Sequence, residues 1–154
     1  MPRKKGVQEA VRDLRDVVLS CFKQNFSKNM AMDNLVTFEK ACELYDFTMS
    51  QWFSSFGLDD PQVCYVRYDN LVLQFETEVR RVLQFLGVPW HESVADFART
   101  AEKRAERTPS YQKVRQGLNI GVQSSWRNYE FLFKKAEARL LDKWLKHFGF
   151  DAAA

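Results

Sequence analysis

Glycine, proline and cysteine are all scarce in this sequence of 154 residues, which contains 6 Gly, 4 Pro and 3 Cys. So few glycines and prolines argue against an all-β chain, because such chains need many tight turns. The cysteines, Cys21, Cys42 and Cys64, are odd in number and form no Cys-x-x-Cys pair, so we expect neither a disulfide framework nor a zinc site. We interpret them as reduced thiols that are mostly buried.

Long apolar runs are missing as well. No stretch approaches the roughly 18 consecutive apolar residues that a membrane-spanning helix requires. The amino end, Met1–Gly6, is basic, but it lacks the apolar segment that follows the basic residues of a secretory signal. We therefore expect no membrane span and a cytoplasmic location.

Charge of one sign does not dominate, because 23 Lys and Arg face 20 Asp and Glu and leave a net charge of +3. This small excess is compatible with an anionic ligand, and no nucleic-acid partner is expected. Apolar residues are abundant, at 45% with 13 Phe and 4 Trp, which excludes a disordered chain. The length allows one domain. We expect a basic flexible amino end over residues 1–7, a folded domain over 8–150 and a tail over 151–154.

Apolar residues recur at three- and four-residue steps through most of the chain, which predicts a mainly helical structure. The expected helices cover about residues 13–26, 33–56, 71–86, 92–105 and 134–148. Gly57, Gly87 and Gly149 follow three of these helices and are typical of helix ends. Short strands are expected over Gln62–Arg67 and Gln8–Val11, and the long helical crossover between them indicates a parallel pair.

A charged turn joins the first expected strand to the first expected helix. Arg12 ends the strand, and a planar guanidinium at the carboxyl end of a parallel strand suits a phosphate group. Ser20, in the helix, can add a hydroxyl donor. A second interpretation is open, in which Arg12 and Arg15 pair with Asp13 and Asp16 on a solvated turn. In either case Asp13 resembles a helix N-cap, with Asp16 as an acidic residue of the first turn.

Two motifs of the chain resemble those of the nucleotide-dependent sulfotransferases. Arg12–Asp16, with Ser20 eight positions after Arg12, is similar to the motif that binds the 3′-phosphate in that family, with Leu14 in place of the usual proline. Val66–Val72 resembles the family's Tyr-Glu-Asp-Leu turn, and Phe85–Pro89 resembles the end of its next helix, Phe-Leu-Gly-hydrophobic-Pro.

A third motif follows in the order that the family shows. It consists of Thr108–Ser110, Val114–Gln116 and Ser124–Tyr129, and it resembles the late nucleotide-covering loop of the bacterial tetratricopeptide-repeat-linked and tyrosylprotein sulfotransferases. The motifs together lie within residues 10–149, so the resemblance is to the carboxyl half of the family. Trp126, inside the third motif, is expected to be a core anchor.

The resemblance implies a fold, a reaction and a set of contacts. The fold is the α/β, P-loop NTPase-like sulfotransferase fold, here truncated and mostly helical with about two parallel strands. The reaction transfers a sulfuryl group from 3′-phosphoadenosine 5′-phosphosulfate to an acceptor hydroxyl or amine, without a metal. Carried onto this chain, Arg12 and Ser20 hold the 3′-phosphate, Tyr68 contacts the adenine side, Ser124 approaches the 5′-phosphosulfate, and Arg115 closes the late loop over the nucleotide.

The sequence lacks the Ser/Gly/Thr-rich loop with which the family holds the 5′-phosphosulfate, and it has no GxxxxGK[ST] cradle. The family's catalytic base lies in the same missing stretch, so the catalytic residues are unknown. His91 and His147 do not replace the base, because each stands at the end of an expected helix, where capping or surface roles are commoner. The sequence predicts an incomplete sulfotransferase: a truncated gene product, a gene product with a mispredicted start, or one part of a longer protein.

Two alternatives from other function classes stay open. An inactive remnant would keep the nucleotide contacts without turnover, and a helical interaction module would dock its aromatic faces onto another chain. The exposed edge of a two-stranded parallel sheet favours self-association or pairing with the missing amino-half chain. The acceptor cannot be read from the sequence, and a peptide tyrosine, a carbohydrate, a lipid and a small phenol all remain open.

Overall fold

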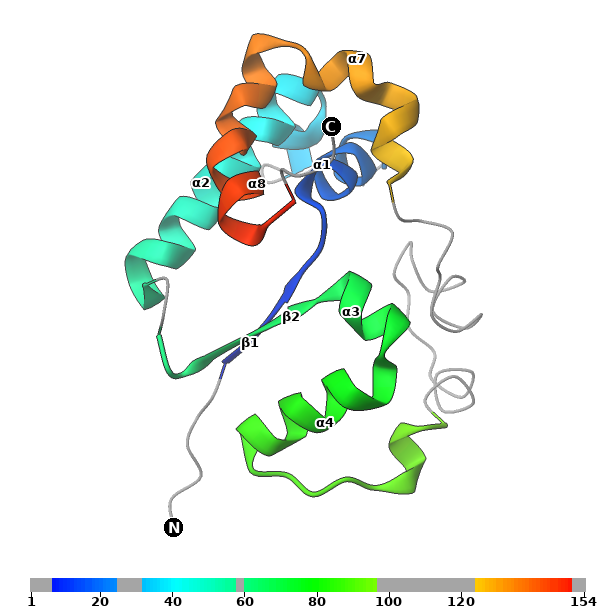
Figure 1. Ribbon diagram of the computed structural model, residues 1–154. Coiled ribbons are helices and arrows are strands. Elements are labelled where there is room, and N and C mark those ends of the chain that lie inside the picture. The colour runs from blue at the N-terminus through cyan, green and yellow to red at the C-terminus, as the bar shows by residue number, and fades with distance from the viewer. Residues whose placement is uncertain (1–6, 25–31, 58–59, 97–123, 151–154) are drawn as a thin grey trace. The chain divides into compact units, whose positions relative to one another are not determined.

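The chain forms two compact units, which Figure 1 shows coloured from blue at the amino end to red at the carboxyl end. The computed structural model describes residues 7–24, 32–57, 60–96 and 124–150. The sheet unit comprises residues 1–10 and 61–122, and the helical unit comprises residues 11–60 and 123–154. The expected division at residues 7 and 150 stays a prediction, because most of both ends lies outside the described residues.

The sheet unit contains two parallel strands, as the crossover predicted. Strands β1 (Val7–Val11) and β2 (Val63–Arg67) are neighbours in one sheet. Helices α3 (Tyr68–Leu73) and α4 (Phe75–Leu86) follow β2 directly, and a short 3-10 helix, η2 (Glu92–Val94), comes after them. The described part of the chain is therefore mostly helical, with one pair of strands.

Buried and partly exposed residues alternate along β2, and this alternation shows which face of the strand packs against the core. Cys64 and Val66 are buried, and with Val82 of α4 they form the core of the sheet unit. The expected single helix over 71–86 is wrong in one respect, because the chain breaks at Gln74. Gln74 leaves helical backbone with φ −138° and ψ 51°, so it ends α3 and begins α4. The apolar spacing continues across this break, which is why periodicity alone did not reveal it.

The helical unit is built from two stretches of chain that are far apart in sequence. Its elements are α1 (Leu14–Lys23), η1 (Met32–Leu35), α2 (Phe38–Phe56), η4 (Ser125–Tyr129), α7 (Glu130–Phe133), η5 (Ala136–Leu141) and α8 (Asp142–Phe148). Leu14, Cys42 and Leu141 are almost completely buried at its centre. The core of this unit therefore joins the first helix of the chain to the last ones.

The ends of the helices follow local capping chemistry. Helix α2 begins at Phe38, later than the expected residue 33, because the Thr37 hydroxyl caps it by accepting the N–H of Lys40 at 3.2 Å. Gly57 and Gly149 end α2 and α8 with positive φ, as predicted. The expected helices over 13–26 and 134–148 are also corrected, because α1 ends at residue 23 and residues 136–141 form a 3-10 helix before α8. Most of the expected helix over 92–105 lies outside the described residues.

The described cysteines are free thiols, and two of them are buried, as expected. Burial raises the pKa of the Cys42 thiol to about 12, and the carboxylates of Glu137 and Glu43 contribute to the same rise. Burial also raises the pKa of Cys21, which is only half-buried. Among the described helices, none has the length and apolar character needed to cross a membrane.

These thiols predict a clear order of chemical labelling. We expect iodoacetamide at about pH 8 to modify Cys21 before Cys42, and the rate at Cys21 to increase with pH, because the thiolate is the nucleophile and its pKa is raised. With a pKa of about 12, Cys42 is a thiolate in roughly one molecule in ten thousand at that pH. Peptide mass spectrometry after timed labelling measures the order. Equal rates at Cys21 and Cys42 in the native protein would contradict the packing described here.

Candidate functional site

The turn between β1 and α1 contains two acid–base pairs. The Asp13 carboxylate caps α1 by accepting the N–H of Arg15 at 3.0 Å, and it pairs with the Arg15 guanidinium at 2.7 Å. Arg12 Nη2 lies 3.6 Å from Asp16 Oδ2. The predicted cap and both predicted pairs are confirmed. The expectation of a solvated turn is wrong, because Asp16 is 1% exposed and Arg15 is 8% exposed.

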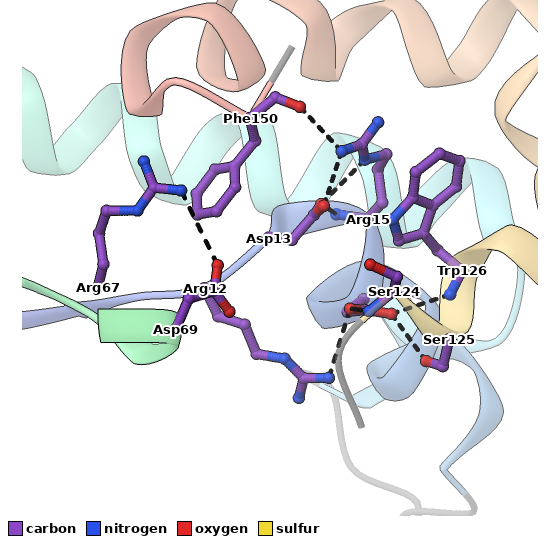
Figure 2. A network of polar contacts seen from close by, with 10 residues as sticks. Arg12, Asp13, Arg15, Arg67, Asp69, Ser124, Ser125, Trp126 and Phe150 are labelled. Carbon is purple, nitrogen blue, oxygen red and sulfur yellow. Dashed lines mark hydrogen bonds and ion pairs between the residues drawn. The ribbon is translucent and has the colours of Figure 1, made fainter. Parts of the chain in front are cut away.

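Asp16 is the centre of this turn, and its carboxylate gathers donors from a distant segment. Oδ1 accepts the hydroxyl of Ser125 at 2.7 Å and the N–H of Trp126 at 2.9 Å, while Oδ2 accepts the N–H of Ser124 at 2.8 Å. In Figure 2, dashed lines lead from the labelled Ser125 and Trp126 to this carboxylate, which is drawn without a label. Asp16 thus caps the start of η4 from another helix, and it ties the Arg12–Asp16 turn to the Ser124–Tyr129 segment.

Sequence reasoning did not predict this role. Asp16 was expected to complement the helix dipole or to pair with a neighbouring arginine, and nothing local distinguishes a first-turn aspartate that faces solvent from one that caps a distant segment. The one available signal was that Asp16 stands on the same face of the helix as Leu19, which is buried. That position makes burial of the carboxylate foreseeable but does not identify its donors.

Arg15 fixes the opposite side of the turn. Its guanidinium lies 3.8 Å from the centroid of the Trp126 ring and donates to the carbonyl oxygen of Phe150 at 2.9 Å. Figure 2 shows the Arg15 side chain between the two. Trp126 is 6% exposed, so the expectation that it is a core anchor is confirmed. Arg15 therefore has a structural role, because it joins Asp13 at the start of α1 to Trp126 and to the backbone of Phe150.

Arg12, Asp16 and Ser20 form one line along the start of α1. The ion pair between Arg12 and Asp16 joins positions i and i+4, and Ser20 is four residues beyond Asp16 on the same helix face. The Arg12 side chain is 24% exposed, and Ser20 is exposed. The solvent-facing side of this line consequently presents a guanidinium and a hydroxyl, with the carboxylate buried beneath them.

Ser124 joins this line through its backbone. Its side chain is exposed, and its φ of 62° lies in the left-handed region, which is unfavourable for a residue with a Cβ. It is the only non-glycine residue with positive φ in the part of the chain that the structure describes. The structure thus brings three of the predicted site residues, Arg12, Ser20 and Ser124, to the surroundings of one buried carboxylate.

The other two predicted site residues do not belong to the described part of the helical unit. Tyr68 is the first residue of α3 in the sheet unit, where it is half-buried between Arg67 and Asp69, whose charged groups are 3.8 Å apart. Arg115 lies outside the described residues. Their proposed contacts with a nucleotide stay predictions.

His91 has the capping role that its position predicted, and His147 is exposed in the last turn of α8. His91 Nδ1 accepts the N–H of Ser93 at 3.2 Å and caps η2. His147 packs edge-on against Phe53, with ring centroids 4.8 Å apart. Over the described residues, no cluster of three or more His, Cys, Asp or Glu side chains is suited to a metal ion.

Comparison with known proteins identifies the family. A sequence model described as the Sulfotransferase family matches residues 9–92, which is more than half of the chain and includes Arg12, Ser20 and Tyr68. An uncharacterized protein from Aquifex aeolicus (strain VF5) is similar, with 29% identity over 133 residues that cover 84% of this chain and 17% of that protein. The chain thus spans about a sixth of the length of this curated relative. The predicted resemblance is confirmed, and the chain belongs to the sulfotransferase family.

Proposed function

We propose that this chain carries the 3′-phosphate side of a sulfotransferase site, with 3′-phosphoadenosine 5′-phosphosulfate as the sulfuryl donor. The observation that carries the proposal is the line formed by Arg12, Asp16 and Ser20, to which Ser124 is tied. In this proposal the two parallel strands are part of a P-loop-like sheet, which family membership favours.

The exposed groups of the line suit the 3′-phosphate. Arg12 offers a partly exposed guanidinium, whose planar donors match phosphate oxygens, and Ser20 offers an exposed hydroxyl one helical turn beyond Asp16. The amide end of α1 does not contribute at Arg15, because the Asp13 carboxylate already accepts that N–H. The phosphate would therefore be held by side chains along the flank of the helix and not by the N–H of Arg15.

Asp16 does not exclude an anion from this surface. Its carboxylate is 1% exposed, accepts three hydrogen bonds and faces the Arg12 guanidinium, so its charge is largely compensated within the protein. A phosphate arriving from solvent meets the exposed side of Arg12, while Asp16 stays on the buried side.

The remaining contacts of the proposal follow the family resemblance. Tyr68 would contact the adenine side, Arg115 would close the late loop over the nucleotide, and Ser124 would approach the 5′-phosphosulfate. The donor supplies an activated sulfuryl group when it is bound, and this chain's own residues hold and orient the nucleotide. No residue is assigned as the base that deprotonates the acceptor. Turnover and the acceptor are proposals for the whole protein, of which this chain need be only a part.

Titration calorimetry with adenosine 3′,5′-bisphosphate tests the proposal. We expect the unmodified chain to bind this nucleotide and Arg12→Ala to weaken binding by about 10- to 100-fold, since a hydrogen bond to a charged group contributes roughly 1.5–3 kcal/mol. Ser20→Ala removes a neutral donor, so we expect a smaller loss of about two- to tenfold. Both losses should be smaller for adenosine 5′-monophosphate, which lacks the 3′-phosphate.

Arg139→Ala is the matched control, because it removes the same charge from an exposed position in η5. It should leave the dissociation constant within about twofold, since distant surface charges act only through screened long-range attraction. Absence of heat with the unmodified chain would reject the nucleotide site and favour a helical interaction module. Binding without sulfuryl transfer, in this chain or in a longer one, would favour an inactive remnant.

A further inference from the structure

We propose that Asp16 is a positioning residue of the nucleotide site: it sets the spacing between Arg12 and Ser124 and holds Ser124 in a strained backbone conformation. This inference rests on the proposed function, because Arg12 and Ser124 are two of its nucleotide contacts. Asp16 itself is buried and would not touch the nucleotide.

One oxygen atom anchors both contacts. Asp16 Oδ2 accepts the N–H of Ser124 at 2.8 Å and lies 3.6 Å from Nη2 of Arg12, although Ser124 is 108 positions from Asp16 in the chain. The other oxygen is held by the Ser125 hydroxyl and the N–H of Trp126. A carboxylate fixed through both oxygens is a rigid reference point. The distance from the Arg12 guanidinium to the backbone of Ser124 is consequently set by Asp16.

The backbone of Ser124, which Asp16 anchors, is in a conformation that is energetically unfavourable for serine. At φ 62° the Cβ of a residue other than glycine crowds its own carbonyl oxygen. Such strain persists where the surroundings over-determine the conformation, and it is concentrated at functional sites. Glycine would avoid the strain, but it would also remove the hydroxyl. The exposed hydroxyl of Ser124 is therefore the group that the strained conformation presents to solvent.

Two substitutions at Ser124 separate the strain from the hydroxyl. Ser124→Gly and Ser124→Ala both remove the hydroxyl, but only glycine relieves the left-handed conformation. We expect Ser124→Gly to raise the melting temperature by about 2–5 °C and Ser124→Ala to leave it within about 1 °C. Both should weaken binding of adenosine 3′,5′-bisphosphate by about two- to tenfold. A glycine variant that binds as tightly as the unmodified chain would overturn the proposal.

Asp16→Asn tests the positioning role, because electrostatics and positioning predict opposite changes in the affinity for adenosine 3′,5′-bisphosphate. Electrostatics alone predicts tighter phosphate binding, because a negative charge beside the site is removed and Arg12 loses a competing partner. Positioning predicts the opposite, a loss of about tenfold. Both oxygens of Asp16 accept backbone N–H groups, so an asparagine side chain must turn its NH₂ donor toward one of them and lose that contact.

The comparison ligand is adenosine 5′-monophosphate, which cannot use the spacing between two phosphate contacts. We expect Asp16→Asn to weaken the bisphosphate more than the monophosphate, whereas partial unfolding would weaken both by the same factor. Equal or tighter binding of the bisphosphate would overturn the inference while leaving the proposed function intact, provided that Arg12→Ala still weakens it. No binding by the unmodified chain would reject the proposed function and this inference with it.

Discussion

Replacing Asp16 with alanine is expected to lower the free energy of unfolding of the helical unit by about 3–5 kcal/mol. The change removes the acceptor for the N–H groups of Ser124 and Trp126 and for the hydroxyl of Ser125, and it takes the carboxylate away from Arg12. A buried donor that loses its acceptor costs about 1–3 kcal/mol, and the three are lost together. Urea denaturation followed by tryptophan fluorescence measures the effect.

Glu130→Ala is the matched control for this prediction. Glu130 also forms an i,i+4 pair, with Lys134 at 3.3 Å, but both side chains are more than half exposed. An exposed pair of this kind contributes about 0.3–0.5 kcal/mol, so we expect the urea midpoint to change little. If Asp16→Ala were as mild as Glu130→Ala, the carboxylate would not hold the late segment, and the description of the site would fail.

Truncating Trp144 is expected to have an effect of similar size, about 3–5 kcal/mol for Trp144→Ala. Trp144 is 7% exposed, stacks on Phe53 of α2 with ring centroids 5.3 Å apart, and donates its indole N–H to Asp46 at 2.7 Å. The alanine variant removes the ring from the core and the donor from Asp46. Because Phe53 and Trp144 join α2 to α8, the loss should appear as one cooperative change in the urea transition.

Trp144→Phe separates packing from the hydrogen bond. Phenylalanine keeps a ring against Phe53 but cannot donate to Asp46, which retains its ion pair with Lys143 at 2.7 Å. We expect a loss of about 1–2 kcal/mol, between the unmodified chain and the alanine variant. A phenylalanine variant as unstable as the alanine variant would show that the hydrogen bond, and not the packing of the ring, accounts for the stability at this position.

The local elements were largely predictable, because they depend on residues close together in sequence. Asp13 capped α1 as predicted, and Gly57, Gly87 and Gly149 ended their helices through left-handed or positive-φ backbone that glycine adopts without strain. The apolar spacing did not predict a helix break where the helical period of apolar residues continues across the break. The interruption at Gln74 is of this kind, since the apolar residues on either side of it keep helical spacing.

The candidate site was predicted in part. Arg12 and Ser20 followed from the motif, and the same local pattern also allowed their charged neighbours to pair with one another on a solvated turn. The pairs formed, but Asp16 and Arg15 of this turn are buried, because η4 contacts Asp16 and Phe150 contacts Arg15. Because they are buried, the charged residues Asp16 and Arg15 of the motif have structural roles, whereas Arg12 keeps an exposed side.

By itself the sequence determined the family, the helical character, the parallel pair of strands and the three helix ends at Gly57, Gly87 and Gly149. These properties depend on motif spacing, on apolar periodicity and on capping residues, all of which act over a few positions. Only the tertiary structure decided that Asp16 binds a segment 108 to 110 positions away and that Ser124, in that segment, has a left-handed conformation. A carboxylate has no preference of its own for a partner so distant; folding brings the donors to it, and exclusion of water then makes each bond costly to lose.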